Sequence, residues 1–325
     1  MTAQHCASDG TAMQTWDVNA RSALFDLYGD HLLSRGQQAP VAALVRLLAP
    51  AAISPPAVRT AVSRMARQGW LVPVRLPGGA GYRLTPRATS RLRQASDRIY
   101  RTAMPAWDGQ WHVVVIDRVT ERAKRDRLKS ALGYLGYACL DGSTWISPRS
   151  SAELDQVIAA EQVRAERFFA SYDGDARGLA ARAWDLDGLA SAYRHWIARA
   201  GEIAARAADD QSDDLIFAVR SELVHEWRKF LFVDPGLPTD LLPPDWPGIV
   251  ATVSFQAEAD RLLPAAARFV DRTLAASNGR RTSPPNPQQP PTHDPNLSTT
   301  HPDPSTAWSE SATSQPHTVQ SHTVQ

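Results

Sequence analysis

The 325-residue sequence predicts an α+β protein made of more than one domain, on three observations. Apolar residues recur at helical spacing along much of the chain. Two separate groups of short runs rich in β-branched and aromatic residues indicate strands. The C-terminal stretch is rich in Pro, Ser, Thr, Asn and Gln and has too few apolar residues to form a core. We therefore place domains at residues 20–104, 105–176 and 177–276, between a disordered N-terminus at 1–19 and a disordered tail at 277–325.

The first domain is predicted to begin with three helices. Apolar residues at helical spacing indicate the first two, over residues 21–35 and 40–50. A short break then leads to Ser54, which suits the N-cap of a third helix over residues 55–68. Gly69 is expected to end this helix.

Two strands and a fourth helix follow. Residues 70–86 contain a strand, a glycine-rich turn and a return strand, and a helix is expected from Pro86 to about Met104. Three helices followed by a β-hairpin is the element order of a winged helix-turn-helix fold, which we predict for residues 20–104.

Positive charge is concentrated in this first domain. The whole chain has a formal net charge of +1, whereas residues 20–104 contain thirteen Arg, no Lys and three Asp, a net charge of +10. Residues 105–276 contain twenty Lys and Arg against twenty-six Asp and Glu, a net charge of −6. A basic face that only meets solvent would usually contain lysines and interspersed acids, so this block favours nucleic-acid binding.

The helix over residues 55–68 separates its apolar and polar residues onto opposite arcs of a helical wheel. Arginine pairs with the edge of guanine or with phosphate, and small hydroxyl residues allow close approach. We therefore predict that the polar arc contacts the major groove of double-stranded DNA. Its residues are Arg59, Thr60, Ser63, Arg64 and Arg67.

Two further arginines, Arg75 and Arg83, flank the tip of the predicted hairpin. They either contact phosphate or the minor groove, or are exposed to solvent without a partner, and the sequence leaves both alternatives open. Both are retained as candidate DNA-binding residues.

The second domain has the predicted order β-α-β-β-α-β, which is that of a ferredoxin-like fold. An Asp-Gly pair marks the hairpin between its two middle strands. The expected elements lie at residues 107–119, 120–135, 137–148 (both middle strands), 151–163 and 166–174.

Asp117 follows the first of these strands. In some ferredoxin-like nucleases an acid at this place holds a metal ion between two subunits. A single carboxylate without a partner acid or histidine is better explained as a turn residue at the end of a strand.

The third domain is predicted to be mostly helical, with a long helix that ends near Val233. His225 and Glu226 resemble the start of a zinc-protease helix, but Lys229 stands where the second histidine is required, so we expect no zinc site. Either Arg228 and Lys229 lie in solvent, or His225, Arg228 and Lys229 line a pocket for an anionic ligand. These three are the candidate ligand-binding residues.

Cysteine content and hydropathy limit the location of the protein. Cys6 and Cys139 are the only cysteines, which excludes a disulfide framework and suits reduced thiols in the cytoplasm. No apolar run approaches the roughly eighteen residues of a membrane helix, and the N-terminal residues lack the pattern of a signal peptide. We expect a cytoplasmic protein with no membrane partner and no cofactor.

The chain resembles the PaaX family, repressors of phenylacetic acid degradation. The resemblance covers about residues 21–248 and rests on segments in family order. These segments are RSALFDLYGDHL, AVRTAVSRMARQGWL, WDGQWHVVVID, CLDG, STWISP, WDLDGLASAYRHW and LVHEWRKFLFVDPGLPTDLLPPDWPG. The Pro/Ser/Thr-rich tail departs from the family pattern.

The resemblance implies a homodimer that binds operator DNA and releases it when a coenzyme A thioester binds, phenylacetyl-CoA in the best-known members. It implies that the recognition helix comprises residues 59–67 and that the C-terminal signature runs from His225 to Pro238. It also implies a regulator rather than an enzyme.

The competing class is an enzyme. A metal-dependent ferredoxin-like nuclease would depend on Asp117, and an acyl-CoA-acting enzyme would depend on His225 as base, with nothing near it in sequence to complete a triad. A scaffold that binds RNA is disfavoured, because the polar arc of the third helix carries no aromatic residue for stacking on bases.

Overall fold

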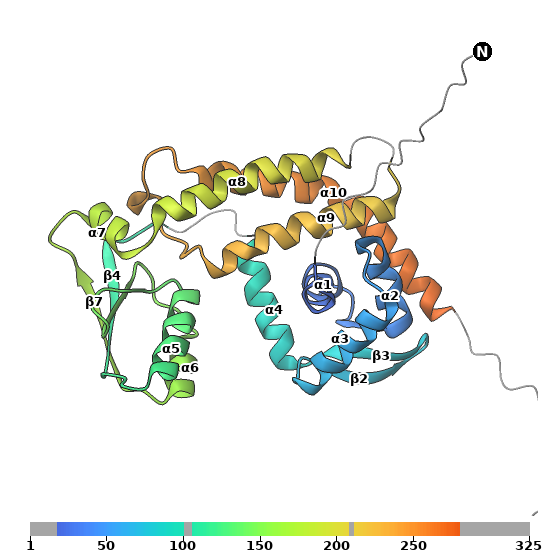
Figure 1. Ribbon diagram of the computed structural model, residues 1–325, viewed down its shortest axis with the longest axis horizontal. Helices are drawn as coiled ribbons and strands as arrows, with labels where there is room; N and C mark the ends of the chain where they lie inside the picture. Colours follow the sequence, from blue (N-terminus) through green and yellow to red (C-terminus); the bar gives the residue numbers. More distant parts are fainter. Residues whose placement is uncertain (1–17, 101–105, 208–210, 280–325) are drawn as a thin grey trace, which may run out of the picture. The chain divides into compact units, whose positions relative to one another are not determined.

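The computed structural model describes residues 18–100, 106–207 and 211–279 (Figure 1). The expected disordered N-terminus and tail fall almost wholly outside these ranges. Within them, no helix combines the length and the hydropathy that a membrane span requires.

The N-terminal region contains the expected helices and hairpin, and one strand that the sequence did not indicate. Its elements are α1 (Ala20–Leu27), a π-helical turn (Tyr28–Leu32), β1 (Gln38–Pro40), α2 (Val41–Leu48), α3 (Pro55–Arg67), β2 (Leu71–Leu76), β3 (Gly79–Leu84) and α4 (Pro86–Ile99). Strand β1 has three residues, too few for an alternating pattern, and it exists because it pairs with β3.

The three strands form an antiparallel sheet in the order β1-β3-β2. Gly81 lies where β3 passes close to β1, and a Cβ atom there would lie 2.6 Å from the carbonyl oxygen of Ala39, so this position requires glycine. The sheet closes a core of buried side chains from α1, α2 and α3, in which the Tyr28 hydroxyl donates a hydrogen bond to the carbonyl oxygen of Tyr82 at 3.0 Å.

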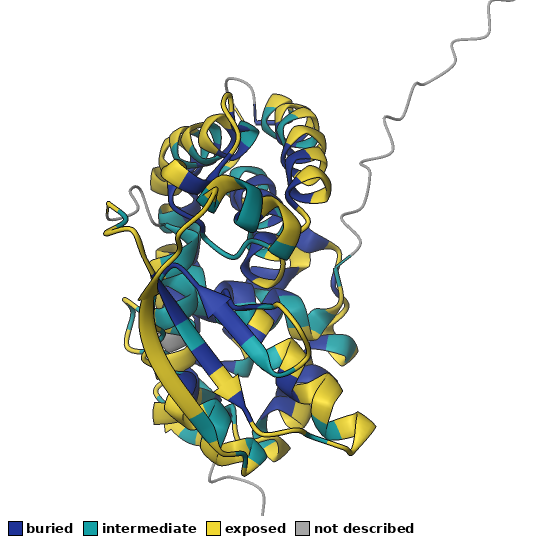
Figure 2. Cartoon of the chain, turned by 90° about the vertical axis from the view of Figure 1, so that its left-hand side faces the viewer, coloured by how far each residue is buried: buried dark blue, intermediate teal, exposed yellow. Residues whose placement is uncertain are grey.

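The central region consists of β4 (Gln110–Ile116), α5 (Arg122–Tyr134), β5 (Ala138–Cys139), β6 (Thr144–Ser147), α6 (Leu154–Glu161) and β7 (Ala165–Ser171). This is the β-α-β-β-α-β order expected from the sequence. The strands form an antiparallel sheet in the order β5-β6-β4-β7. Strand β4 lies inside the sheet and is largely buried, whereas β7 is an edge strand and largely exposed (Figure 2).

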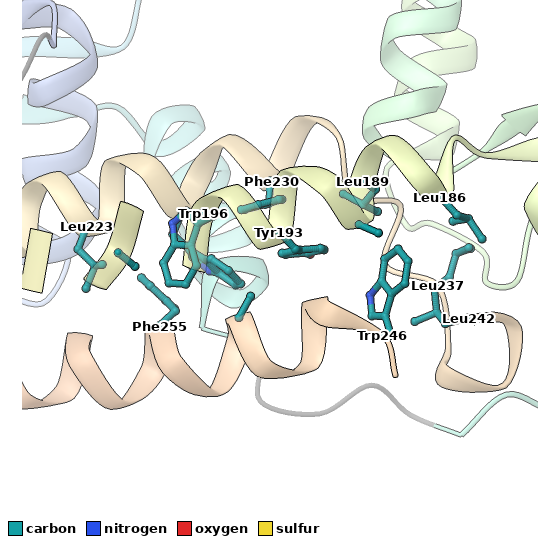
Figure 3. Packing of buried hydrophobic residues seen from close by; sticks show 14 of the residues in the cluster. Leu186, Leu189, Tyr193, Trp196, Leu223, Phe230, Leu237, Leu242, Trp246 and Phe255 are labelled. Carbon is teal, nitrogen blue, oxygen red and sulfur yellow. The ribbon is translucent and has the colours of Figure 1, made fainter. Parts of the chain in front are cut away.

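The C-terminal region is helical, as expected, with α7 (Ala176–Ala183), α8 (Leu186–Ala205), α9 (Asp213–Trp227) and α10 (Pro247–Asn278). The helix expected to reach Val233 is α-helical only to Trp227 and continues as a 3-10 helix, η3 (Arg228–Phe232), before Pro235. A short 3-10 turn, η4 (Thr239–Leu241), precedes α10. Helices α8, α9 and α10 pack together around buried aromatic side chains (Figure 3).

The N-terminal core is completed by residues from far along the chain. Phe217 of α9 and Ala266 and Val270 of α10 are fully buried in the same cluster as the side chains of α1, α2 and α3. Arg46 of α2 donates a hydrogen bond to Ser277 near the end of α10. Residues 18–100 therefore share their apolar core with helices α9 and α10.

A buried ion pair also joins the π-helical turn after α1 to α9. The guanidinium of Arg220 pairs with the carboxylate of Asp30, donates to the hydroxyl of Tyr100 at 3.2 Å, and donates to the carbonyl oxygen of Ala259 at 3.1 Å. Arg220 is 2% exposed, so nearly all of its charge must be balanced by these protein groups.

His31 is a buried histidine beside this ion pair. Burial, followed by the charge of Arg35, lowers the pKa of His31 to about 4. The carboxylate of Asp30 is 3.1 Å from His31 Nε2, but Arg220 already balances its charge. Asp271 favours the charged imidazole but itself pairs with Arg35. The folded chain therefore holds His31 in its neutral form.

We expect His31 to make the protein less stable in mild acid. The unfolded chain binds a proton at about pH 6.5, whereas the folded chain does not until about pH 4. This stability is therefore present above the unfolded pKa and is lost as the pH falls toward 4. Urea unfolding of the wild type and His31→Leu at pH 7.5 and pH 4.5 measures the effect. The wild type should lose about 2–3 kcal/mol more than the variant; equal losses would contradict the assignment.

Candidate nucleic-acid interface

Helix α3 has well-defined ends and one buried side. The Oγ of Ser54 accepts a hydrogen bond from the backbone N–H of Ala57, and two prolines occupy the first turn, where a missing N–H costs nothing. Gly69 follows the helix with a φ of +74°, a conformation that favours glycine. The apolar arc is buried against the N-terminal core through Val58, Ala61, Val62 and Met65.

The opposite side of α3 is exposed along its whole length, and all five residues predicted from the helical wheel lie on it: Arg59, Thr60, Ser63, Arg64 and Arg67. Within the described ranges, none of the three arginine side chains forms an ion pair or a hydrogen bond. Exposed arginines elsewhere commonly have an acidic partner, as Arg127 has in Glu161. The positive charge of α3 is therefore not compensated by any of the residues that the structure describes.

Two of the three acidic residues in the basic block face inward. Asp26 and Asp30 lie on α1 and the turn that follows it, and they bind side chains of α9 and η3 instead of neighbouring arginines of their own region. The outward face of residues 18–100 is therefore more basic than the sequence count implies. The sequence analysis did not predict that these two acids face inward, although the small number of acids in the basic block was a signal that each has a specific partner.

The register of the hairpin separates Arg75 from Arg83. Arg75 pairs with Ala80 and Arg83 pairs with Val72, so the two arginines lie on opposite faces of the sheet. Arg75 shares its face with Leu71, which is buried in the core with α3. Arg83 lies on the other face, where its Nε donates to Gln38 Oε1 at 2.9 Å. Arg75 is therefore on the side of the sheet from which α3 extends.

Of the three candidate ligand-binding residues, His225 and Arg228 lie together, with 3.4 Å between Arg228 Nε and His225 Nδ1, whereas Lys229 has a different partner. His225 Nδ1 lies 2.8 Å from one carboxylate oxygen of Asp26, and Arg228 Nε lies 2.6 Å from the other. Lys229 pairs instead with Glu226 at 2.6 Å. His225 and Arg228 thus connect α9 and η3 to α1, and a ligand role for the three remains a prediction.

Asp117 is the residue on which the nuclease alternative depends. Asp117 is exposed and lies 4.0 Å from Arg164. In the described part of the chain, no cluster of three or more His, Cys, Asp or Glu side chains is placed to hold a metal ion.

Three family models match successive parts of the chain. They are the PaaX-like protein at residues 19–88, the PaaX protein central Cas2-like domain at 104–179, and the PaaX-like protein C-terminal domain at 184–272. Transcriptional repressor PaaX of Escherichia coli (strain K12) is 28% identical over 284 residues, which cover 84% of this chain and 90% of that protein. A solved structure, uncharacterized protein Rv0674 from Mycobacterium tuberculosis, matches with a TM-score of 0.51 at 25% identity, covering 78% of this chain and 98% of its own.

Proposed function

The chain belongs to the PaaX family, and on that premise we propose that it is a transcriptional repressor that binds operator DNA through α3 and releases it when an acyl-CoA such as phenylacetyl-CoA binds. The regulated genes would serve the breakdown of aromatic acids of the phenylacetate type. The observation that carries the DNA-binding part is the exposed face of α3, with three arginines that no described acid neutralises.

The surrounding fold supports this use of α3. Helices α1 to α3 and the β2-β3 hairpin have the order of a winged helix-turn-helix, in which the last helix enters the major groove. From Arg59 to Arg67 the helix rises about 12 Å, so the arginines follow the groove across several base pairs. The order of strands in the central sheet supports a ferredoxin-like fold for that region.

Effector release needs two states that differ in affinity for DNA and for ligand. The contacts of Asp26 with His225 and Arg228, and of Asp30 with Arg220, give the C-terminal helices a direct physical link to α1, against which α3 packs. A homodimer would present two α3 helices to an inverted repeat whose half-sites lie one or two turns of DNA apart.

A gel shift tests the proposal. The purified full-length protein is mixed with its own upstream intergenic DNA, with and without phenylacetyl-CoA. We expect a specific complex that the thioester dissociates. A complex that persists would retain the DNA-binding function and remove phenylacetyl-CoA as effector, whereas absence of any complex at low salt would overturn the function.

The hairpin provides a second test of how the DNA lies. Arg75 is on the α3 side of the sheet, so Arg75→Ala should remove one phosphate contact. The slope of log affinity against log salt is negative, and its magnitude should decrease by about 0.9. Arg83→Ala should leave the slope unchanged, since that side chain faces away and binds Gln38. Dissociation constants measured between about 50 and 200 mM salt decide the matter. The reverse result would place DNA on the other face of the hairpin.

A further inference from the structure

A pocket of about 380 Å³ lies where α4, α8, η3 and the start of α10 meet. We call it the junction pocket. Aromatic side chains form one part of its walls, among aliphatic and polar residues: the rings of Tyr193 and Phe230 stack with centroids 4.1 Å apart and planes 9° apart, and Trp246 packs edge-on against Tyr193 (Figure 3). Flat, rigid walls of this kind suit a flat apolar ligand group.

Two exposed residues that line the junction pocket are aliphatic. Ile249 and Val253 of α10 line the pocket and are 52% and 61% exposed. Exposed aliphatic side chains beside an aromatic cavity indicate a surface that a ligand covers, because apolar area left in water costs free energy.

Two charged groups of the pocket, Arg98 and Asp234, favour a ligand with an acceptor oxygen, and the other acid of the lining, Asp240, is exposed to solvent. Arg98 of α4 donates to the carbonyl oxygens of Tyr134 and Leu231 at 3.0 and 3.1 Å, and among the described residues its Nε–H has no acceptor. The Asp234 carboxylate is already occupied, since one oxygen accepts from the Tyr193 hydroxyl at 2.6 Å and the other from the Gly236 N–H at 2.8 Å. The cation thus retains donor capacity, while both oxygens of this acid are engaged.

We propose that the junction pocket binds an aryl group that carries a carbonyl or carboxylate, with the ring among Tyr193, Phe230 and Trp246 and the oxygen toward Arg98. A volume near the lower end of the 300–1,000 Å³ typical of ligand pockets admits such a group and leaves a nucleotide outside the mouth. The assignment of the junction pocket as the effector site rests on the proposed function.

The position of Arg98 provides a way for a ligand in the junction pocket to change DNA binding. Arg98 belongs to α4, which begins two residues after the β3 strand of the hairpin, and its guanidinium joins α4 to Tyr134 of α5 and Leu231 of η3. Tyr100 at the end of α4 donates to Asp30 next to α1. A ligand oxygen that accepts a hydrogen bond from Arg98 therefore acts on α4, the helix that connects to the hairpin and, through Tyr100, to Asp30 next to α1.

The test uses a matched pair of valines on α10. Val253→Trp fills the mouth of the junction pocket, whereas Val250, which is 57% exposed, does not line it and provides the control Val250→Trp. Calorimetric titration of the full-length chain with phenylacetyl-CoA, phenylacetate and coenzyme A separates the thioester, the free acid and the nucleotide as ligands. Val253→Trp should weaken aryl binding at least tenfold, and Val250→Trp should change it less than twofold, with melting temperatures of both variants close to that of the wild type.

The outcomes for the pocket and for the repressor are distinct. Wild-type aryl binding that survives Val253→Trp, equal binding of coenzyme A alone, or no binding of either aryl compound at millimolar concentration would each overturn the pocket, whatever the gel shift shows. Aryl binding that Val253→Trp removes supports the pocket even if the protein forms no DNA complex, in which case only the repressor function fails.

Discussion

Replacing Arg59, Arg64 and Arg67 together with alanine should abolish specific DNA binding while leaving the fold intact. Each arginine that reads a base contributes about 1–3 kcal/mol to discrimination, so the triple variant should lose at least about 3 kcal/mol, or roughly 150-fold in affinity. The fold should survive because the three side chains are exposed and form no ion pair or hydrogen bond within the described ranges. Gel shifts with specific and unrelated DNA measure the loss.

The matched control removes the same charge elsewhere. Arg118, Arg122 and Arg164 are exposed arginines of the central region, and replacing them with alanine also lowers the net charge by three. This control should bind specific DNA within a few-fold of the wild type. Equal losses in the two triple variants would mean that net charge, and not the face of α3, governs binding.

Arg220→Met should lower the free energy of unfolding by more than any surface substitution. The buried Asp30 carboxylate would lose its counter-ion, and removing one partner of a buried ion pair typically costs about 3–5 kcal/mol. Burial lowers the pKa of Arg220 to about 10, so the guanidinium is still charged at neutral pH and the pair is ionic there. Guanidinium chloride unfolding of the two proteins at pH 7 gives the difference.

A double variant separates the lost charge pair from the lost packing. Arg220→Met with Asp30→Leu removes both charges, and it should recover a large part of the stability that Arg220→Met loses, because no unpaired carboxylate remains. A loss below 1 kcal/mol in the single variant, on the order of a surface ion pair, would show that water reaches this pair in solution.

The parts of the fold that could be predicted are those in which local pattern and tertiary packing agree. Helix α3 was predicted with its N-cap and its two faces, because Ser54, the prolines and the apolar arc act within a few residues of each other. Strand β1 was missed, because three residues ending in Pro40 become a strand only by pairing with β3. The change from α9 to the 3-10 helix at Arg228 was likewise beyond a periodicity argument.

The residues of the candidate site also divide into those that local pattern predicts and those that depend on distant contacts. The exposed arginines of α3 could be predicted because burial of the opposite arc determines where they point. The partners of His225 and Arg228 could not, because Asp26 lies about two hundred residues away in sequence. The junction pocket depends on four elements meeting, which no single segment encodes, although the aromatic residues that line it stand in the segments on which the family resemblance rests.

The sharing of the N-terminal core by Phe217, Ala266 and Val270 bears on how such a regulator can be engineered or can evolve. The N-terminal segment, for which we propose DNA binding, cannot simply be exchanged between proteins. A chimera that joins residues 18–100 to a foreign sensor would leave uncovered the apolar surface that α9 and α10 now cover. Changes of operator preference are therefore expected through substitutions on the outer face of α3, and less readily through exchange of the whole N-terminal half.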